Sequence, residues 1–432
     1  MEEKKVAFHH FGCKVNFAEG SALSRQFVEK GYELTDFHEK ADIYVISTCV
    51  VTAVAEKKCR AAIRQAHKIN PEARIAVIGC FSELKPGEIA TMEGVSVVLG
   101  HSNKFDLLQE IENHHDSTSY GHHFGGHQTF VPSYSFGDRT RSFLKIQDGC
   151  DYYCSYCTIP FARGHSRSDS IENVVKSARK VASDGIKEII LTGVNIGDFG
   201  RGTSETFIGL VRRLETESGL PRIRISSIEP DLLSPEIIEI IAKSEKFMPH
   251  FHIPLQAGSD EVLKKMKRKY DTALFASRIS DIKKAMPHAC IACDIIAGFP
   301  AETRENFSDT VHFVENLDIS YLHVFSYSRR ERTLAAGMTD LVTSRERKER
   351  SQILHRISEE KKSIFYADNR DRESFVLFES DETNGYMHGF TENYIRVKTL
   401  FNPDLINQVV KVKLQEQDTE GVFIFHQNKN DA

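Results

Sequence analysis

The sequence between residues 142 and 327 repeats one pattern six times: a strand-like run followed by a helical pattern. The six runs lie at residues 143–146, 188–192, 223–228, 250–255, 291–296 and 321–327. This repetition favours parallel strands that alternate with covering helices, as in a (βα) barrel. Because a closed barrel of this kind has eight units, six units predict an incomplete barrel whose open side admits a large substrate.

Three further strand-like runs precede this region, at residues 6–11, 43–47 and 75–78, and alternate with helical patterns. A cysteine follows each run within two residues: Cys13, Cys49 and Cys80. The alternation predicts a second parallel sheet. Because the carboxyl ends of parallel strands lie along one edge, we expect the three thiols to meet in one crevice.

The length of 432 residues allows two or three domains. We expect an N-terminal α/β domain at residues 1–113, a linker at 114–138, the incomplete barrel at 139–368 and a small antiparallel β-barrel at 369–432. The barrel domain is expected to end in an amphipathic helix that buries Ile353, Ile357 and Ile364. No rigid element fixes the linker histidines, so we interpret them as part of a solvated loop: His114, His115, His122, His123 and His127.

Composition excludes some classes of protein. The formal net charge of -5 gives no overall basic excess of the kind typical of nucleic-acid-binding proteins. No apolar run is long enough to span a bilayer, and the first residues lack the features of a secretory signal, so we expect a cytoplasmic protein without membrane contact. Nine cysteines in such a chain are typical of metal ligands or reactive thiols rather than of a disulfide framework.

Cys150, Cys154 and Cys157 have the spacing CxxxCxxC directly after the first barrel run, at the end where barrel enzymes have their active sites. Three thiolates can bind three irons of a 4Fe-4S cluster and leave the fourth iron open to a small molecule. The alternative is a structural zinc site completed by a fourth ligand such as His165. We favour the iron-sulfur cluster because no fourth cysteine or histidine stands at the usual short spacing.

This motif, with Tyr156 before the last cysteine, resembles the signature of the radical S-adenosylmethionine (SAM) superfamily. The stretches at residues 11–16, 47–52 and 78–80 resemble the three N-terminal cysteine motifs of the methylthiotransferase family. Within that family, Gly-Cys-Lys-Val-Asn at 12–16 resembles the MtaB branch, which acts on threonylcarbamoyladenosine in tRNA. Isopentenyladenosine enzymes more often carry Gln-Met-Asn there, and ribosomal-protein enzymes Pro-Lys-Asn.

The resemblance extends through nearly the whole chain. Further matches lie at residues 146–150, 160–164, 191–197, 253–259 and 294–300, and residues 389–394 resemble the RNA-binding TRAM module. The loop at 326–333 departs from the family because it lacks the prolines and glycine of a common Pro-Arg-Pro-Gly-Thr turn, which leaves its rigidity open.

The resemblance implies two 4Fe-4S clusters and SAM as cofactors. SAM would bind the open iron held by the catalytic cysteines Cys150, Cys154 and Cys157 and be cleaved to a 5′-deoxyadenosyl radical. A radical is needed because the C2 hydrogen of adenine is too weakly acidic for a general base. The second cluster, on the N-terminal cysteines, would supply sulfur that a separate SAM methylates.

The implied reaction converts N6-threonylcarbamoyladenosine next to the anticodon, at position 37, to its 2-methylthio derivative. The implied partners are tRNA, an electron donor such as flavodoxin or ferredoxin, and a sulfur source. Two alternatives stay open: a methylthiotransferase acting on isopentenyladenosine or on a ribosomal-protein side chain, and a non-catalytic iron-sulfur protein that binds RNA or transfers electrons.

The candidate contacts to SAM and RNA also have ordinary structural interpretations. The candidates for SAM lie in the cysteine loop or near strand ends, where polar residues also serve ordinary turns: Tyr156, Gly193, Ser226, Glu229 and Gln256. The candidates for RNA lie in a basic run and in the last module, where such charges are also common on solvated faces: Lys267, Arg268, Tyr394, Arg396 and Lys398. Cys59, Cys290 and Cys293 are interpreted as buried structural residues.

Overall fold

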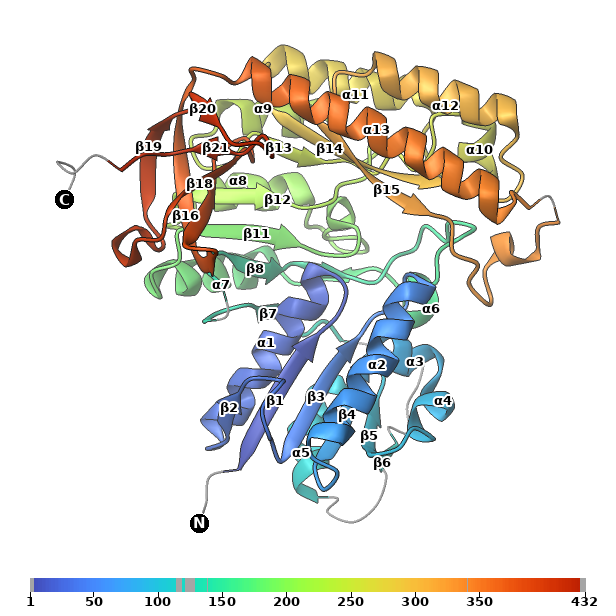
Figure 1. Cartoon of the computed structure of the whole chain (residues 1–432), viewed down its shortest axis with the longest axis vertical. Coiled ribbons are helices and arrows are strands. Elements are labelled where there is room, and N and C mark those ends of the chain that lie inside the picture. Colours follow the sequence, from blue (N-terminus) through green and yellow to red (C-terminus); the bar gives the residue numbers. More distant parts are fainter. Residues whose placement is uncertain (1–3, 114–118, 121–128, 138, 340, 428–432) are drawn as a thin grey trace.

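The computed structural model describes residues 4–113, 119–120, 129–137, 139–339 and 341–427. An N-terminal sheet with its helices, in blue, lies next to the curved wall of the barrel, in green to orange (Figure 1). The C-terminal sheet, in red, lies at the left end of the barrel wall, beside β11 and β12. The five linker histidines lie outside the described residues.

The N-terminal sheet is parallel throughout, with the strand order β2-β1-β3-β4-β5-β6. Its strands are β1 (Lys5–His10), β2 (Glu33–Thr35), β3 (Ile43–Thr48), β4 (Arg74–Gly79), β5 (Val95–Leu99) and β6 (Ser119–Tyr120). Its helices are α1 (Lys14–Glu29), α2 (Ala53–Ile69), α3 (Cys80–Leu84), α4 (Pro86–Ala90) and α5 (Leu107–Asn113). Apolar clusters lie on both faces of the sheet, which explains why β3 is mostly apolar and buried along its whole length.

The barrel has six parallel strands and stays open. β8 (Ser142–Lys145), β11 (Glu188–Thr192) and β12 (Arg222–Ile225) form one sheet, and β13 (His250–His252), β14 (Cys290–Ala297) and β15 (Tyr321–Ser326) form another. Two parallel bridges, Ile223–Phe247 and Ser227–His252, join them into one wall. Within the described residues β8 pairs with β7 (Ser133–Tyr134) on its free side and not with β15. The predicted α/β fold with an incomplete barrel is confirmed.

Helices cover the outer face of this wall: α7 (Ile171–Ser183), α8 (Phe207–Glu217), α9 (Pro235–Lys243), α10 (Asp260–Lys265), α11 (Thr272–Ala285) and α12 (Arg304–Asn316). Ser170, Thr206 and Ser234 each accept a hydrogen bond from a backbone N–H of the first turn, which fixes where α7, α8 and α9 begin.

The long helix α13 (Ser344–Asp368) packs along β15 and buries Leu354 and Ile357. The sequence pattern also predicts a buried Ile364, and this prediction is wrong, since Ile364 is 60% exposed. The reason is that Ile364 faces an open groove bordered by Leu317 and Asp368.

The C-terminal sheet has the strand order β19-β16-β17-β18-β21-β20. Its strands are β16 (Glu373–Thr383), β17 (Tyr386–Phe390), β18 (Arg396–Leu400), β19 (Val409–Lys413), β20 (Glu416–Gln417) and β21 (Phe423–Ile424). The pairs are antiparallel except for β18 with β21, so the part expected to be a purely antiparallel barrel is a curled, mainly antiparallel sheet. The sequence pattern did not predict β17, because His388 and Gly389 weaken its strand signal.

A buried carboxylate joins the C-terminal sheet to the barrel. Glu188, the first residue of β11, accepts hydrogen bonds from Nε of Arg222 at 2.7 Å and from Nε of Arg224 at 2.8 Å. The same guanidinium groups donate to four backbone carbonyl oxygens of the sheet, those of Phe375, Phe390, Thr391 and Glu392. The sheet is therefore held at the N-terminal ends of the barrel strands, away from the cysteines.

Candidate functional site

The CxxxCxxC loop lies between β9 (Gln147–Asp148) and α6 (Ile159–Arg163). Gly149 has a φ of +71°, and a Cβ there would lie 2.0 Å from the carbonyl oxygen of His165, so the loop requires glycine at its start. The N–H of Cys150 donates to the carbonyl oxygen of Gly164 at 3.0 Å. The loop thus begins in one fixed conformation.

The three thiols of this loop lie close enough to perturb one another. Burial raises the pKa of Cys150 and of Cys157 to about 12, and the neighbouring Cys154 adds to both effects. The backbone N–H groups of Tyr152 and Ile159 donate to the sulfurs of Cys150 and Cys157, at 3.5 and 3.4 Å. Such a donor set fits an iron-sulfur cluster, because bound iron favours the thiolate and the N–H groups stabilise its charge.

His165, the fourth ligand of the zinc alternative, points away from these sulfurs. Its Nδ1 lies 2.8 Å from Oδ1 of Asp151, and its side chain is 82% exposed. The geometry therefore favours the iron-sulfur cluster over a closed zinc site.

Arg268 connects the loop to a buried carboxylate. Its Nη1 donates to the sulfur of Cys154 at 3.1 Å, and its Nη2 donates to Glu229. Burial raises the pKa of Glu229 to about 7, and the Arg268 charge opposes that rise. The basic run predicts an Arg268 that contacts RNA phosphates, but the structure places its side chain inside, 3% exposed and beside the cysteines.

The N-terminal cysteines come together at the carboxyl edge of their sheet. Cys13 precedes α1, Cys49 follows β3, and Cys80 is the first residue of α3. Burial raises the pKa of Cys49 to about 12, and Cys80 and Cys13 add to the rise. A Cβ at Gly12 would lie 2.8 Å from Cβ of Cys49, so glycine lets the two loops approach each other. This set of three sulfurs also fits a cluster with one open iron.

Arg163 reaches from the barrel side into this second set of cysteines. Its Nε donates to the sulfur of Cys80 at 3.3 Å. Its Nη atoms donate to Asp148 at 2.8 Å, to Glu19 at 3.2 Å and to Asn16. Because Arg163 ends the short helix α6, which begins soon after the CxxxCxxC loop, one helix links the two sets of cysteines.

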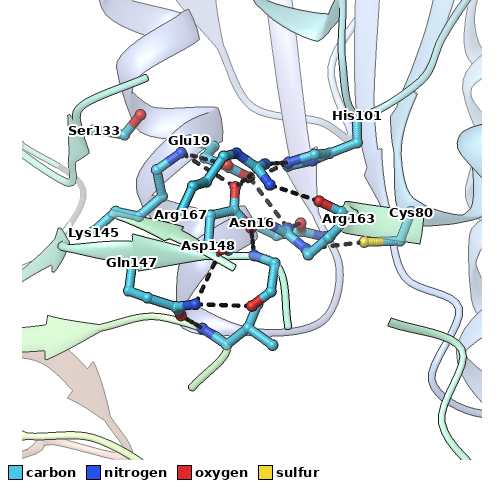
Figure 2. Close-up of polar contacts among 12 residues, drawn as sticks. Asn16, Glu19, Cys80, His101, Ser133, Lys145, Gln147, Asp148, Arg163 and Arg167 are labelled. Carbon is cyan, nitrogen blue, oxygen red and sulfur yellow. Dashed lines mark hydrogen bonds and ion pairs between the residues drawn. The ribbon is translucent and has the colours of Figure 1, made fainter. Parts of the chain in front are cut away.

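A buried charge network surrounds Arg163 (Figure 2). Burial alone would raise the pKa of Glu19 and of Asp148, but facing groups hold both values well below their usual range. These groups are Lys104, Lys145 and Arg163 for Glu19, and His101, Arg163 and Lys145 for Asp148. Burial lowers the pKa of His101 to about 3, so this imidazole is neutral. Four cations face the two carboxylates: Lys104, Lys145, Arg163 and Arg167. The excess positive charge beside Cys80 favours a negatively charged group there.

A cavity of about 210 Å³ is lined by neighbours of both sets of cysteines, although none of the cysteines is among its described lining residues. Val51 and Thr52 border it from the loop after Cys49, and Tyr156 borders it from the CxxxCxxC loop. Its other lining residues come from β14, β15 and the loops after β13 and β15: Gln256, Asp294, Ile296, Phe325, Ser326, Tyr327 and Ser328. A planar base in this mainly apolar cavity would face both sets.

The predicted SAM contacts fall in more than one place. Tyr156 and Gln256 line the cavity of about 210 Å³. Glu229 accepts a hydrogen bond from Arg268, and Ser226 lines a different cavity. The Oγ of Ser226 is buried without a hydrogen-bond partner among the described residues, so it is free for a ligand.

Gly193 lies against Gln147. A Cβ at Gly193 would lie 2.9 Å from Oε1 of Gln147, and this oxygen accepts hydrogen bonds from the N–H groups of Val194 and Asn195 at 2.9 and 2.8 Å. Within the described part of the chain, both side-chain amide atoms of Asn195 are buried without a partner. This loop therefore offers fixed backbone and unpaired polar atoms next to the CxxxCxxC loop.

The remaining candidates for RNA contact differ in exposure. Lys267 and Arg396 are exposed, whereas Lys398 pairs with Asp418. The Tyr394 ring stacks with His250, at 4.3 Å between centroids, and with Phe390, at 4.6 Å. The predicted stacking of a base on Tyr394 would therefore compete with two rings of the protein itself.

The other cysteines are buried, as interpreted: Cys59, Cys290 and Cys293 are all 0% exposed. The loop at 326–333 is held by the N-terminal domain despite its missing prolines. Oγ of Ser328 accepts a hydrogen bond from the N–H of Ala53 at 3.2 Å, and Arg330 forms a buried ion pair with Glu56. Contacts between domains thus replace the rigid turn.

Sequence reasoning gave no role to Arg163, Lys14 or His323. Arg163 and Lys14 stood inside stretches that carried the family resemblance, and their position next to cysteine motifs was the available signal. His323 interrupts an apolar strand at an inward position, which is a weak signal for a polar lumen.

Comparisons with known proteins agree with this geometry. Residues 144–314 match the radical SAM superfamily, and residues 5–100 match the family described as uncharacterized protein family UPF0004. The radical SAM methyltransferase TsrM from Kitasatospora setae has a similar fold, with a TM-score of 0.56 at 15% identity over 77% of both chains. The cobalamin-dependent SAM radical enzyme OxsB gives a TM-score of 0.52 at 14% identity, over 83% of this chain and 56% of that one. Fold and site together define a radical SAM enzyme.

Curated relatives narrow this class. Threonylcarbamoyladenosine tRNA methylthiotransferase MtaB of Bacillus subtilis is 39% identical over 97% of this chain and 96% of its own length. The protein of the same name from Aquifex aeolicus is 34% identical over 91% and 96%. tRNA-2-methylthio-N(6)-dimethylallyladenosine synthase of Bacillus subtilis is 30% identical over 96% and 84%. The chain belongs to the MtaB family of threonylcarbamoyladenosine tRNA methylthiotransferases. Among the described helices, none has the length and apolar character of a membrane span.

Proposed function

We propose that this chain converts N6-threonylcarbamoyladenosine next to the tRNA anticodon into its 2-methylthio derivative, as a cytoplasmic enzyme. The observation that carries the proposal is a cavity lined by residues of both cysteine loops, Val51 and Thr52 after Cys49 and Tyr156 before Cys157. Identity of 39% to Bacillus subtilis MtaB over nearly the whole chain supports the choice of substrate.

Two resident clusters belong to this proposal. Cys150, Cys154 and Cys157 would hold a 4Fe-4S cluster with SAM at its open iron, which supplies a carbon radical able to take hydrogen from an unactivated carbon. The N-terminal cysteines would hold a second 4Fe-4S cluster, which supplies the sulfur. A protein with two open clusters on one cavity can start a radical and deliver a group to the same base.

The chain's own residues position and shield the reactants. Arg268 donates a hydrogen bond to the sulfur of Cys154 and so holds a positive charge beside it. Gln147 accepts a hydrogen bond from the N–H of Val194 and so holds the loop next to Gly193. A base that fills this mainly apolar cavity would displace water from it, which protects a reactive radical. Val51 and Phe325, which line the cavity, are 54% and 45% exposed and offer apolar contact to a base turned out of its stack.

The proposed partners are tRNA, an electron donor such as flavodoxin or ferredoxin, and a sulfur source. The experiment is anaerobic turnover of reconstituted enzyme with SAM, sulfide and reductant. Three substrates are offered in parallel: tRNA with threonylcarbamoyladenosine, tRNA with isopentenyladenosine, and ribosomal protein. Mass spectrometry should find the methylthio group on threonylcarbamoyladenosine. Methylthiolation of isopentenyladenosine or of protein alone contradicts the proposal, and absence of SAM cleavage favours a non-catalytic iron-sulfur protein.

A further inference from the structure

A second cavity, of about 190 Å³ and called the inner cavity here, lies nearer the N-terminal ends of the barrel strands than the first, outer one. Side chains from β12, β13 and β15 line it, among them Ser226 at the end of β12, His250 and His323. Lys14 of the N-terminal domain also lines it, although Lys14 directly follows Cys13 in the sequence. This inner cavity therefore lies within reach of the residues around the N-terminal cysteines.

The inner cavity lies next to the outer one along the same strands. On β14, Ala292 lines the inner cavity, and Asp294 and Ile296 line the outer one. On β15, His323 lines the inner cavity and Phe325 the outer one. Residues two apart point to the same face and are separated by about 6.6–6.8 Å along a strand. A substituent of the ligand that extends by this distance along the strands would reach the inner cavity.

The lining of the inner cavity offers positive charge and hydrogen-bond donors. Lys14 is exposed, and within the described part of the chain no hydrogen bond or ion pair is found for its side chain. Burial lowers the pKa of His250 and of His323, so both are neutral and each carries one ring N–H. Nδ1 of His250 and Oγ of Ser226 are buried without a partner among the described residues.

The nearby carboxylate of Asp294 does not supply a free negative charge to the inner cavity. Among the described residues that line the inner cavity there is no carboxylate. Asp294, at the border of the two cavities, accepts a hydrogen bond from Nε2 of His252 at 2.8 Å. A small anion with a hydroxyl group would satisfy the unpaired groups of the lining better than an apolar ligand.

We propose that the inner cavity binds the N6 substituent of the substrate adenosine through its carboxylate, with Lys14 as the pairing cation and His323 as a hydrogen-bond donor. This inference rests on the proposed function. N6 and the C2 hydrogen are attached to ring carbons on either side of N1, and their bonds to the ring diverge. A base whose C2 faces the cysteines therefore directs its N6 substituent away from them. An isopentenyl group carries no charge. When it bound, it would cover Lys14 and leave the buried ammonium group without a partner.

A metal ion is the competing occupant. Ligand atoms of His252, Asp294 and His323 lie within 4.8 Å of one another. Lys14, however, lines the same cavity as His252 and His323, and its charge would repel a metal cation bound there. The charge of the cavity therefore favours an anion.

The experiment measures equilibrium binding of anticodon stem-loops to the reconstituted enzyme without reductant. The stem-loops carry threonylcarbamoyladenosine, its neutral methyl ester or isopentenyladenosine. The wild-type enzyme should bind the acid about tenfold more tightly than the ester, as expected for one charge-assisted hydrogen bond. Lys14→Gln and His323→Leu should each reduce this preference several-fold. Lys176→Gln, an exposed lysine on α7, is the matched control and should keep it.

Iron and sulfide analysis of each variant checks that the clusters are intact. Equal wild-type affinity for acid and ester, or a preference that both substitutions leave unchanged, overturns the inference. So does one zinc or iron per chain that is lost only in His323→Leu. If the same wild-type enzyme methylthiolates threonylcarbamoyladenosine while it binds acid and ester equally, the proposed function stands and only this inference fails. If it methylthiolates isopentenyladenosine alone, both fail.

Discussion

Arg163 donates a hydrogen bond from Nε to the sulfur of Cys80 at 3.3 Å, although the two residues belong to different domains of the fold. The guanidinium also touches Asp148, so its charge is fixed in a buried position between the cysteine sets. A fixed positive charge next to a cluster stabilises the reduced state, which carries one more electron.

Arg163→Met should therefore lower the midpoint potential of the N-terminal cluster. The measurement is a redox titration followed by electron paramagnetic resonance, in a background in which Cys150, Cys154 and Cys157 are alanine. Arg163→Lys keeps the charge and should restore most of the potential, though not the forked hydrogen bonds. An unchanged potential in Arg163→Met, with the cluster intact, contradicts the assigned role.

The backbone conformation at Gly149 should make any larger residue there incompatible with the CxxxCxxC loop. Gly149→Ala places a Cβ 2.0 Å from a backbone oxygen at a φ of +71°, so the CxxxCxxC loop must shift and its cluster should be lost. Gly202 is the matched control, since its φ is +80° but a Cβ there would meet nothing within 4 Å among the described residues. Gly202→Ala should cost only about 1 kcal/mol of folding stability and keep the iron. Equal iron content in both variants would argue against the steric explanation.

Arg268 and Lys267 are neighbours with different expected roles. Arg268→Met removes the charge beside Cys154 and should slow reductive SAM cleavage about tenfold, the loss expected for one charge-assisted hydrogen bond. Lys267→Met changes an exposed cation and should leave cleavage unchanged while it weakens tRNA binding and its salt dependence. Formation of 5′-deoxyadenosine and tRNA titrations at two salt concentrations check both. The assignment is wrong if the two variants behave alike.

The ion cluster around Glu188 should make the stability of the fold depend on pH. Burial alone would raise the pKa of Glu188, but Arg224, Arg222 and Arg141 outweigh burial and hold it well below the ordinary value of 4.5. A lowered pKa in the folded state means that this stabilisation is complete above the unfolded value and is lost as the pH falls below it. Glu188→Gln should reduce the free energy of unfolding by about 3 kcal/mol at neutral pH and flatten the loss of stability below about pH 4.5.

Thermal unfolding of the apo protein at several pH values measures this effect. Glu379→Gln is a milder control, because Glu379 pairs only with Arg141 among the described residues and is 20% exposed. If Glu188→Gln loses stability below about pH 4.5 as steeply as the wild type does, the role assigned to the ion cluster is wrong.

The fold was predictable because its signals are local. Strands β1, β3 and β4 and the six barrel strands each carry an apolar run, whereas β2, β5 and β6 were not predicted. The cysteines follow strands whose ends share an edge, so Cys13, Cys49 and Cys80 could be placed together in advance. β17 was missed because it contains Gly389, which weakens the strand signal. Glycine is required there because a Cβ would lie 2.5 Å from the side chain of Val376, and no local sequence pattern shows this contact.

The polar partners of the site were not predictable in the same way. Arg268 belongs to a basic run that is typical of a solvent-exposed face, and only the packing of the loop after α10 against Ser155 turns it inward. The role of Arg163 depends on how one domain docks on another, because its partners Glu19 and Cys80 are far away in sequence. Such contacts are set by tertiary structure and leave no periodic signal.

The central claim is that two separate sets of three cysteines each bind a 4Fe-4S cluster. Iron and sulfide per chain, measured after anaerobic reconstitution, test it most directly. The wild-type protein should contain about eight of each, and alanine variants of either set should contain about four. The variant without Cys13, Cys49 and Cys80 should still cleave SAM and form no methylthio product. About four irons in the wild type, or zinc in place of iron, would contradict the claim.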